Sequence, residues 1–125
     1  DGAATWKRVS QPEVGVHFGF PVAVDDHDGR TAWLVPGKSD AERMTIGGGL
    51  FVARTRDGGE SWEALRNSLP QEHAYDVVYR HALANRGPCL CFGTTTGNLY
   101  VSEDSGDSFV TVANNLPPVY SVRFG

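Results

Sequence analysis

The chain has 125 residues, of which 40% are hydrophobic, enough for one modest core and one domain-sized unit. Its 15 acidic and 11 basic side chains give a formal net charge of -4, which disfavours a nucleic-acid partner because phosphates must be neutralised. No stretch approaches the roughly 20 consecutive apolar residues that span a bilayer, so we expect a soluble chain without membrane association. The sequence leaves the cellular compartment undefined.

Short β-type runs bounded by Gly, Pro, Asn and Asp follow one another along the chain, which is typical of an all-β meander. A lone strand is predicted at 5–9. The first full unit then has strands at 20–24, 32–35, 50–55 and 61–65. The second has strands at 75–79, 89–92, 99–102 and 108–112, and a lone strand follows at 120–124.

Each predicted unit opens with alternating bulky side chains. The three sets are Phe20, Val22 and Val24; Tyr75, Val77 and Tyr79; and Tyr120, Val122 and Phe124. Such strands suit a sheet that is covered by neighbouring sheets on both faces.

A motif of the form S/T-x-D-x-G-x-S-aromatic occurs at residues 55–62 and again 47 residues later, at 102–109. Its defining side chains are Thr55, Asp57, Gly59, Ser61 and Trp62 in the first copy, and Ser102, Asp104, Gly106, Ser108 and Phe109 in the second. An incomplete copy opens the chain, with Asp1 and Trp6 at the motif spacing and Ala3 in place of the glycine. This opening predicts that the chain was cut from a longer repeat array.

A period in the forties with four strands per repeat predicts the blades of a β-propeller. We therefore expect an all-β propeller segment, with about two complete four-stranded antiparallel blades and a single strand on each side. Residues 1–10 would end a preceding blade, 20–66 and 75–113 would form the two full blades, and 119–125 would begin a further one.

The motif resembles the Asp-box, or BNR repeat, of sialidases, sortilin-type receptors, xyloglucanase-type glycosidases and photosystem assembly propellers. Residues 54–62, 92–97 and 116–123 look like the C-terminal blades of bacterial BNR-repeat proteins that are often labelled glycosyl hydrolases or exo-sialidase-like. That label describes a fold and does not by itself imply an activity.

The motif side chains suit a structural role. A carboxylate at Asp57 or Asp104 can accept hydrogen bonds from its own turn, and glycine at 59 or 106 permits a positive φ. A calcium loop is the alternative, but each turn offers fewer than the six to eight oxygen ligands that calcium requires. We expect no metal and no cofactor.

The two cysteines, Cys89 and Cys91, would lie on one face of a strand, an arrangement that makes a poor disulfide. The four histidines are scattered without metal-ligand spacing. Buried, unreactive thiols are expected.

The surface opposite the motif turns is where a propeller usually binds ligands. It contains the longest irregular loop, 36–49, the turn 94–98 and the links 10–19 and 67–74. Its candidate ligand-binding side chains are Lys38, Asp40, Glu42, Arg43, Glu72 and His73. Ordinary solvated charges are the competing interpretation.

Three functions remain open. The first is a non-catalytic scaffold or binding surface, with a carbohydrate or protein ligand and the remaining blades of a larger propeller as partners. The second is a fragment of a sialidase-like or xyloglucanase-like glycoside hydrolase, for which only loop placement suggests carboxylate pairs, Asp40 with Glu72 or Glu42 with Asp76. The third is a homo-oligomer in which several copies complete a ring. We do not expect the chain alone to be an enzyme, and no catalytic residue can be assigned.

Overall fold

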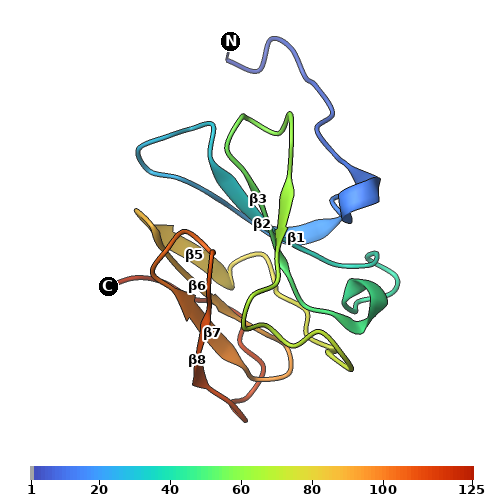
Figure 1. The fold of residues 1–125 in the computed structure, drawn as a ribbon, viewed down its shortest axis with the longest axis vertical. Coiled ribbons are helices and arrows are strands. Elements are labelled where there is room, and N and C mark those ends of the chain that lie inside the picture. Colours follow the sequence, from blue (N-terminus) through green and yellow to red (C-terminus); the bar gives the residue numbers. More distant parts are fainter. Residues whose placement is uncertain (1) are drawn as a thin grey trace.

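The computed structural model describes residues 2–125, so Asp1 of the incomplete motif lies outside the described residues. Eight strands form two four-stranded antiparallel sheets in sequence order (Figure 1). The first sheet contains β1 (Gly19–Val24), β2 (Ala32–Pro36), β3 (Val52–Thr55) and β4 (Glu63–Leu65). The second contains β5 (Leu83–Arg86), β6 (Cys89–Gly93), β7 (Leu99–Ser102) and β8 (Val110–Ala113). The short 3-10 turns η1 (Pro12–Val14) and η2 (Ile46–Gly48) are the helical segments of residues 2–125, so the predicted all-β class is confirmed.

The connection between β1 and β2 is an acidic turn. Asp25 Oδ1 accepts hydrogen bonds from the backbone N–H groups of His27 (2.7 Å) and Asp28 (3.1 Å), and Asp28 Oδ2 accepts one from Thr31 Oγ1 (2.7 Å). The hydrogen bonds from Thr31 and the Arg30 backbone lower the pKa of Asp28. These acids thus stabilise the turn that holds residues 25–31.

The first strand of the second sheet lies later in the chain than the sequence suggests, so the strand predicted at 75–79 is wrong. Arg86 pairs with Cys89, which leaves only Gly87 and Pro88 in the hairpin loop. In the same register, Leu83 pairs with Phe92, and Gly93 N, at the end of β6, donates to Ala82 O. Residues before Ala82 therefore lie beyond the end of β6 and have no partner on it. The short hairpin loop therefore decides which residues form the ladder.

The single flanking strands expected at 5–9 and 120–124 do not form. Residue 5 lies in a bend and residues 6–9 are not assigned to a strand, and the later segment makes one parallel bridge, between Ser121 and His81. The hydrogen bond from Val122 N to His81 O (2.9 Å) nevertheless aligns this segment with the chain leading into β5.

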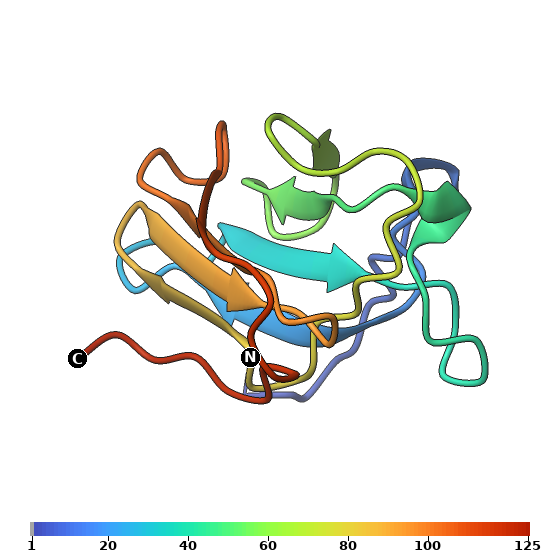
Figure 2. The ribbon, with the colours of Figure 1, turned by 90° about the horizontal axis from the view of Figure 1, so that it is seen from below.

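The main hydrophobic core lies between the two sheets, which pack against each other with β1 beside β5 (Figures 1 and 2). Trp33, Val52, Leu90 and Phe92 are fully buried in it. Each large apolar side chain buried in this way contributes roughly 1.5–3 kcal/mol. One face of the first sheet thus lies against one face of the second.

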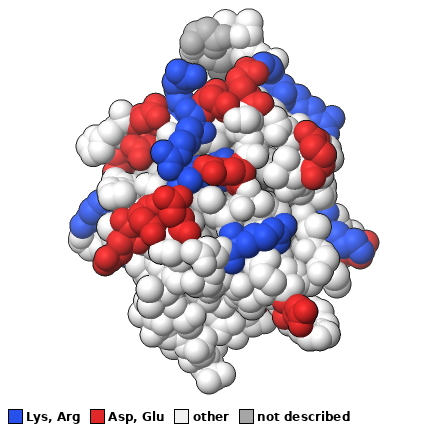
Figure 3. Space-filling model, viewed as in Figure 1, with Lys and Arg blue, Asp and Glu red and all other residues white. Residues whose placement is uncertain are grey.

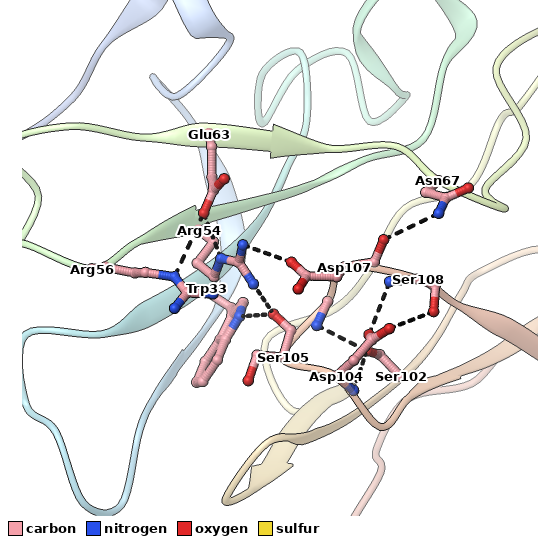
Figure 4. Close-up of polar contacts among 11 residues, drawn as sticks. Trp33, Arg54, Arg56, Glu63, Asn67, Ser102, Asp104, Ser105, Asp107 and Ser108 are labelled. Atoms are coloured by element: carbon pink, nitrogen blue, oxygen red, sulfur yellow. Dashed lines mark hydrogen bonds and ion pairs between the residues drawn. The ribbon is translucent and has the colours of Figure 1, made fainter.

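A polar contact also joins the two sheets (Figure 4). The carbonyl of Ser105, in the turn before β8, accepts hydrogen bonds from Trp33 Nε1 (2.9 Å) and Arg54 Nη1 (2.8 Å). Arg54 also forms ion pairs with Asp107 (2.8 Å) and Glu63 (2.6 Å). Burial opposes the charge of Arg54, but the bonds to the two carboxylates outweigh it and raise the pKa of the guanidinium.

The opposite face of the first sheet is covered by the segment that precedes β1. Val16, Phe51 and Ala53 are buried there, with Trp62 partly buried against them. Both faces of the first sheet thus have buried apolar side chains, but Val22 and Val24 of the alternating bulky set are 62% and 50% exposed, so the expectation that sheets cover these side chains on both faces is wrong here.

Candidate functional site

The two motif turns, residues 55–62 and 102–109, have the same internal hydrogen bonds. Asp57 accepts hydrogen bonds from Ser61 N (2.9 Å) and Ser61 Oγ (2.6 Å), and Gly59 N donates to Thr55 Oγ1 (2.8 Å). Asp104, Ser108, Gly106 and Ser102 repeat these contacts in the second turn, at the same distances.

These hydrogen bonds lower the pKa of the aspartate carboxyl group in each turn. Bonds from Ser61 and Thr55 lower the pKa of Asp57 from 3.8 to about 2. Bonds from Ser108 and Ser102 lower the pKa of Asp104 to about 2 as well. Both carboxylates are therefore charged near neutral pH and engaged within their own turns.

The aromatic residues of the motif copies differ in burial and in contacts. Phe109 is buried and packs edge-on against Phe92, with ring centroids 5.6 Å apart. Trp62 is partly buried and donates its indole N–H to the carbonyl of Val9 (2.9 Å). Trp6, in the incomplete copy, is 88% exposed and covers no turn.

Four of the candidate ligand-binding residues lie in the 36–49 loop and form two local ion pairs. Lys38 pairs with Glu42, and Arg43 Nη2 lies 3.0 Å from Asp40 Oδ1. Figure 3 shows charges of both signs mixed over the upper part of the molecule. Such exposed pairs contribute at most about 1 kcal/mol each, and they offset each other's charge.

The other two candidates, Glu72 and His73, lie in the link between the sheets. This link contacts the loop through the backbone, where Ala74 N donates to Gly48 O (2.9 Å). Within residues 2–125, no hydrogen bond or ion pair joins the side chains of Glu72 or His73 to the four loop charges. The loop and the link are thus neighbours, but the six residues do not form one cluster.

An aromatic row, formed by Phe18, Phe20, Tyr79 and Tyr120, was not predicted from the sequence. Phe18 and Phe20 pack edge to face with ring centroids 5.0 Å apart, and Tyr79 lies 6.5 Å from Phe20. Tyr79 and Tyr120 stack at 5.4 Å with an interplanar angle of 4°. Tyr120 is 66% exposed, so the row ends on an open aromatic ring.

Arg43 links the 36–49 loop to this row. Its guanidinium carbon lies 5.4 Å from the centroid of the Phe20 ring, within the range of a cation–π interaction. Of the six predicted ligand-binding residues, Arg43 contacts the aromatic row, through Phe20. The repeated bulky side chains at the start of each unit were the available signal for it.

A polar cluster around the buried Asp76 stabilises the turn between β6 and β7. Asp76 is 6% exposed, and its Oδ1 accepts hydrogen bonds from Thr96 Oγ1 (2.5 Å) and Asn98 Nδ2 (3.0 Å). Burial, and secondarily the charge of Asp76, raise the pKa of Tyr100 to about 12. The carboxylates of the suggested Glu42 and Asp76 pair are thus each engaged with other partners.

Cys91 is buried and Cys89 partly buried, and both thiols are free. Burial raises the pKa of Cys91, so its reactive thiolate form is disfavoured. Across residues 2–125, no cluster of three His, Cys, Asp or Glu side chains could hold a metal ion. The same part of the chain contains no helix with the length and apolar character needed to traverse a membrane.

Two antiparallel four-stranded sheets, packed face to face with their first strands adjacent, define a segment of a β-propeller. Among solved structures, the chain is similar to the crystal structure of a GH74 enzyme from Niastella koreensis (NkGH74), with a TM-score of 0.54 and 16% sequence identity. The match covers 78% of this chain and 14% of that chain, so it supports the fold alone. No protein-family model matches the sequence, and a search of curated proteins found no match.

Proposed function

We propose that this chain is a non-catalytic segment of an Asp-box propeller that acts as a scaffold and binds carbohydrate on its aromatic row. The observation that carries the proposal is the stacked pair of Tyr79 and Tyr120, with Tyr120 66% exposed. An aromatic face carries partial negative charge and attracts the polarised C–H groups of a sugar ring. Arg43, beside Phe20, adds hydrogen-bond donors for sugar hydroxyl or carboxylate groups.

The state of the carboxylates supports a binding role over a catalytic one. Glycoside hydrolysis uses two carboxyl groups roughly 5 to 9.5 Å apart, one of which stays protonated at the working pH. Asp57 and Asp104 have pKa values of about 2, the opposite of what a general acid requires. Asp40 and Glu42 form ion pairs with basic residues of their own loop.

A second candidate is a segment of a glycoside hydrolase whose acid residues lie elsewhere. The likeness to a GH74 enzyme favours this candidate. In that case the aromatic row would position a sugar chain for carboxylates that other blades supply.

Binding of xyloglucan heptasaccharide and of sialyllactose, followed by calorimetry and by NMR line broadening, tests the proposal. We expect at least one sugar to bind, and Tyr120→Ala to weaken that binding at least tenfold. Tyr75→Ala is the matched control, because Tyr75 is 63% exposed but outside the row, and it should leave affinity unchanged. If neither sugar binds, or if both variants lose affinity equally, the aromatic row is not a sugar site.

Turnover provides a separate check on the non-catalytic part. We expect the chain to leave fluorogenic β-glucosides and sialosides unhydrolysed. Hydrolysis that persists after repurification and disappears in an Asp40→Asn or Glu42→Gln variant would contradict this expectation.

A further inference from the structure

The same apolar contact occurs twice against the motif turns. A Cβ built on Gly106 would lie 2.7 Å from Leu65 Cδ1, so the Leu65 side chain sits directly on the glycine. A Cβ built on Gly59 would lie 2.7 Å from Val9 Cβ. Leu65 and Val9 each stand three residues after an aromatic residue, Trp62 and Trp6 respectively. Each motif glycine is thus covered by the equivalent aliphatic side chain of the preceding repeat.

In both cases, a side-chain hydrogen bond accompanies the apolar contact on the motif glycine. Asn67 Nδ2 donates to the carbonyl of Asp107 (3.2 Å), and Gln11 Nε2 donates to the carbonyl of Glu60 (2.6 Å). Both donors stand two residues after the aliphatic one, and both acceptors directly follow the motif glycine. An aliphatic residue and, two positions on, a side-chain amide therefore recognise a motif turn.

A third copy of this pair lies on the surface. Val112 and Asn114 stand three and five residues after Phe109, in the positions of Leu65 and Asn67. Val112 is 56% exposed, Val110 is 67% exposed, and Asn114 is exposed. A shallow depression here is lined by Val101, Val110 and Val112, with Glu103, Asp104 and Ser108 also contributing. We call Val101, Val110, Val112 and Asn114 the free face.

The free face is more apolar than its counterpart in the first sheet. Val101 pairs with Val110 across β7 and β8, where the first sheet has Arg54 paired with Glu63. On the side shown in Figure 3, few charged side chains lie over the part of the molecule where β7 and β8 are labelled in Figure 1. Exposed valines grouped in this way favour association with another apolar surface.

We propose that the free face docks a second copy of this chain through that copy's first motif turn, residues 55–62. In the single chain, this turn is covered by a short arm, residues 7–11, which forms no ladder with the first sheet. Val112 and Asn114 of the first copy replace the second copy's own Val9 and Gln11, because the two pairs have the same spacing.

The exchange gains contact area that the arm cannot supply. Val112 lies in β8 and Asn114 directly follows it. Val101 and Val110 lie on the same two paired strands, so they would also contact the motif turn and cover more of it. The Val112 carbonyl replaces that of Val9 as acceptor for Trp62 Nε1. Because the free face and the turn are different surfaces, the contact is head-to-tail and builds rings or open chains.

Sedimentation velocity of the full chain over a range of concentrations tests this proposal. We expect the wild type to associate reversibly, and Val112→Asp to weaken association at least tenfold by placing a charge in the contact. Val9→Asp should strengthen it at least tenfold, because repulsion from Glu60 releases the arm from the turn. The double variant should behave like Val112→Asp.

Two measurements make the result specific. Val24→Asp is the matched control, since Val24 is 50% exposed on β1 and outside both surfaces, and it should associate like the wild type. Hydrogen exchange should show residues 9–11 losing protection and 110–114 gaining it as concentration rises. If Val112→Asp unfolds the chain, Asn114→Ala, which removes only the amide, should still weaken association severalfold.

A wild type and a Val9→Asp variant that both stay monomeric at every concentration would overturn the proposal. So would association that Val112→Asp and Asn114→Ala leave intact, or that Val24→Asp weakens equally.

Discussion

At the scale of single residues, the motif carboxylates show how a short spacing defines a local structure. Asp57 and Asp104 each accept a backbone N–H and a hydroxyl from the serine four residues later. These bonds favour the charged form of the carboxylate and lower both pKa values to about 2. A lowered pKa in the folded state means that the turns stabilise the fold most when the acids are ionised.

We therefore expect Asp104→Asn to destabilise the chain at neutral pH, with a difference from the wild type that shrinks as the pH falls. The stabilisation is fully present above the ordinary value of about 3.8 and is lost as the pH falls through about 2. Urea unfolding at pH 7, 4, 3 and 2 measures the difference. Asp26→Asn, in the β1–β2 turn, serves as the control. A difference that stays constant down to pH 2 would contradict the assigned role.

At the scale of elements, the contact between a motif turn and the preceding sheet depends on a glycine. Gly106 has a φ of +95°, and a Cβ there would lie 2.7 Å from Leu65 Cδ1. The positive φ therefore favours glycine at this position, and an added methyl group would also displace the Leu65 side chain of β4. Gly58 also has a positive φ of +73°, but a Cβ there meets nothing within 4 Å.

Alanine substitutions at Gly58 and Gly106 therefore separate the cost of backbone strain from the cost of a steric clash. Gly58→Ala should cost about 1–2 kcal/mol of unfolding free energy from backbone strain alone. Gly106→Ala should cost about 1–3 kcal/mol more, because the new methyl group collides with Leu65. Chemical denaturation measures both, and Leu65→Ala combined with Gly106→Ala should cost less than the sum of the single changes. An equal loss of unfolding free energy in Gly58→Ala and Gly106→Ala would show that the contact between Gly106 and Leu65 is not tight enough to exclude a methyl group.

At the scale of the whole molecule, the two sheets behave as one unit because the second motif turn is bound to the first sheet. Arg54 is 4% exposed and joins the Ser105 carbonyl and the carboxylates of Glu63 and Asp107 (Figure 4). Arg56 also lies near Glu63, at 3.8 Å, but its side chain is 60% exposed.

Arg54→Met should lower the unfolding free energy by about 1–3 kcal/mol, because the charged hydrogen bonds between the sheets are lost. Arg56→Met should change it by less than about 0.5 kcal/mol, as for most exposed pairs. Thermal unfolding followed by near-UV circular dichroism and by tryptophan fluorescence measures both variants. A similar loss in the two variants would mean that Arg54 does not connect the sheets.

The sequence by itself determined the all-β class, the two four-stranded sheets and the positions of most strands. Alternating apolar residues and turn residues are local signals, and each motif turn closes through hydrogen bonds within five residues of its aspartate. The start of the second sheet is also set locally, by the two-residue Gly87–Pro88 hairpin, but the bulky side chains at 75–79 indicated an earlier strand. Only the tertiary structure determines which aromatic rings meet, because Phe20, Tyr79 and Tyr120 come from three distant segments whose contact depends on how the sheets pack.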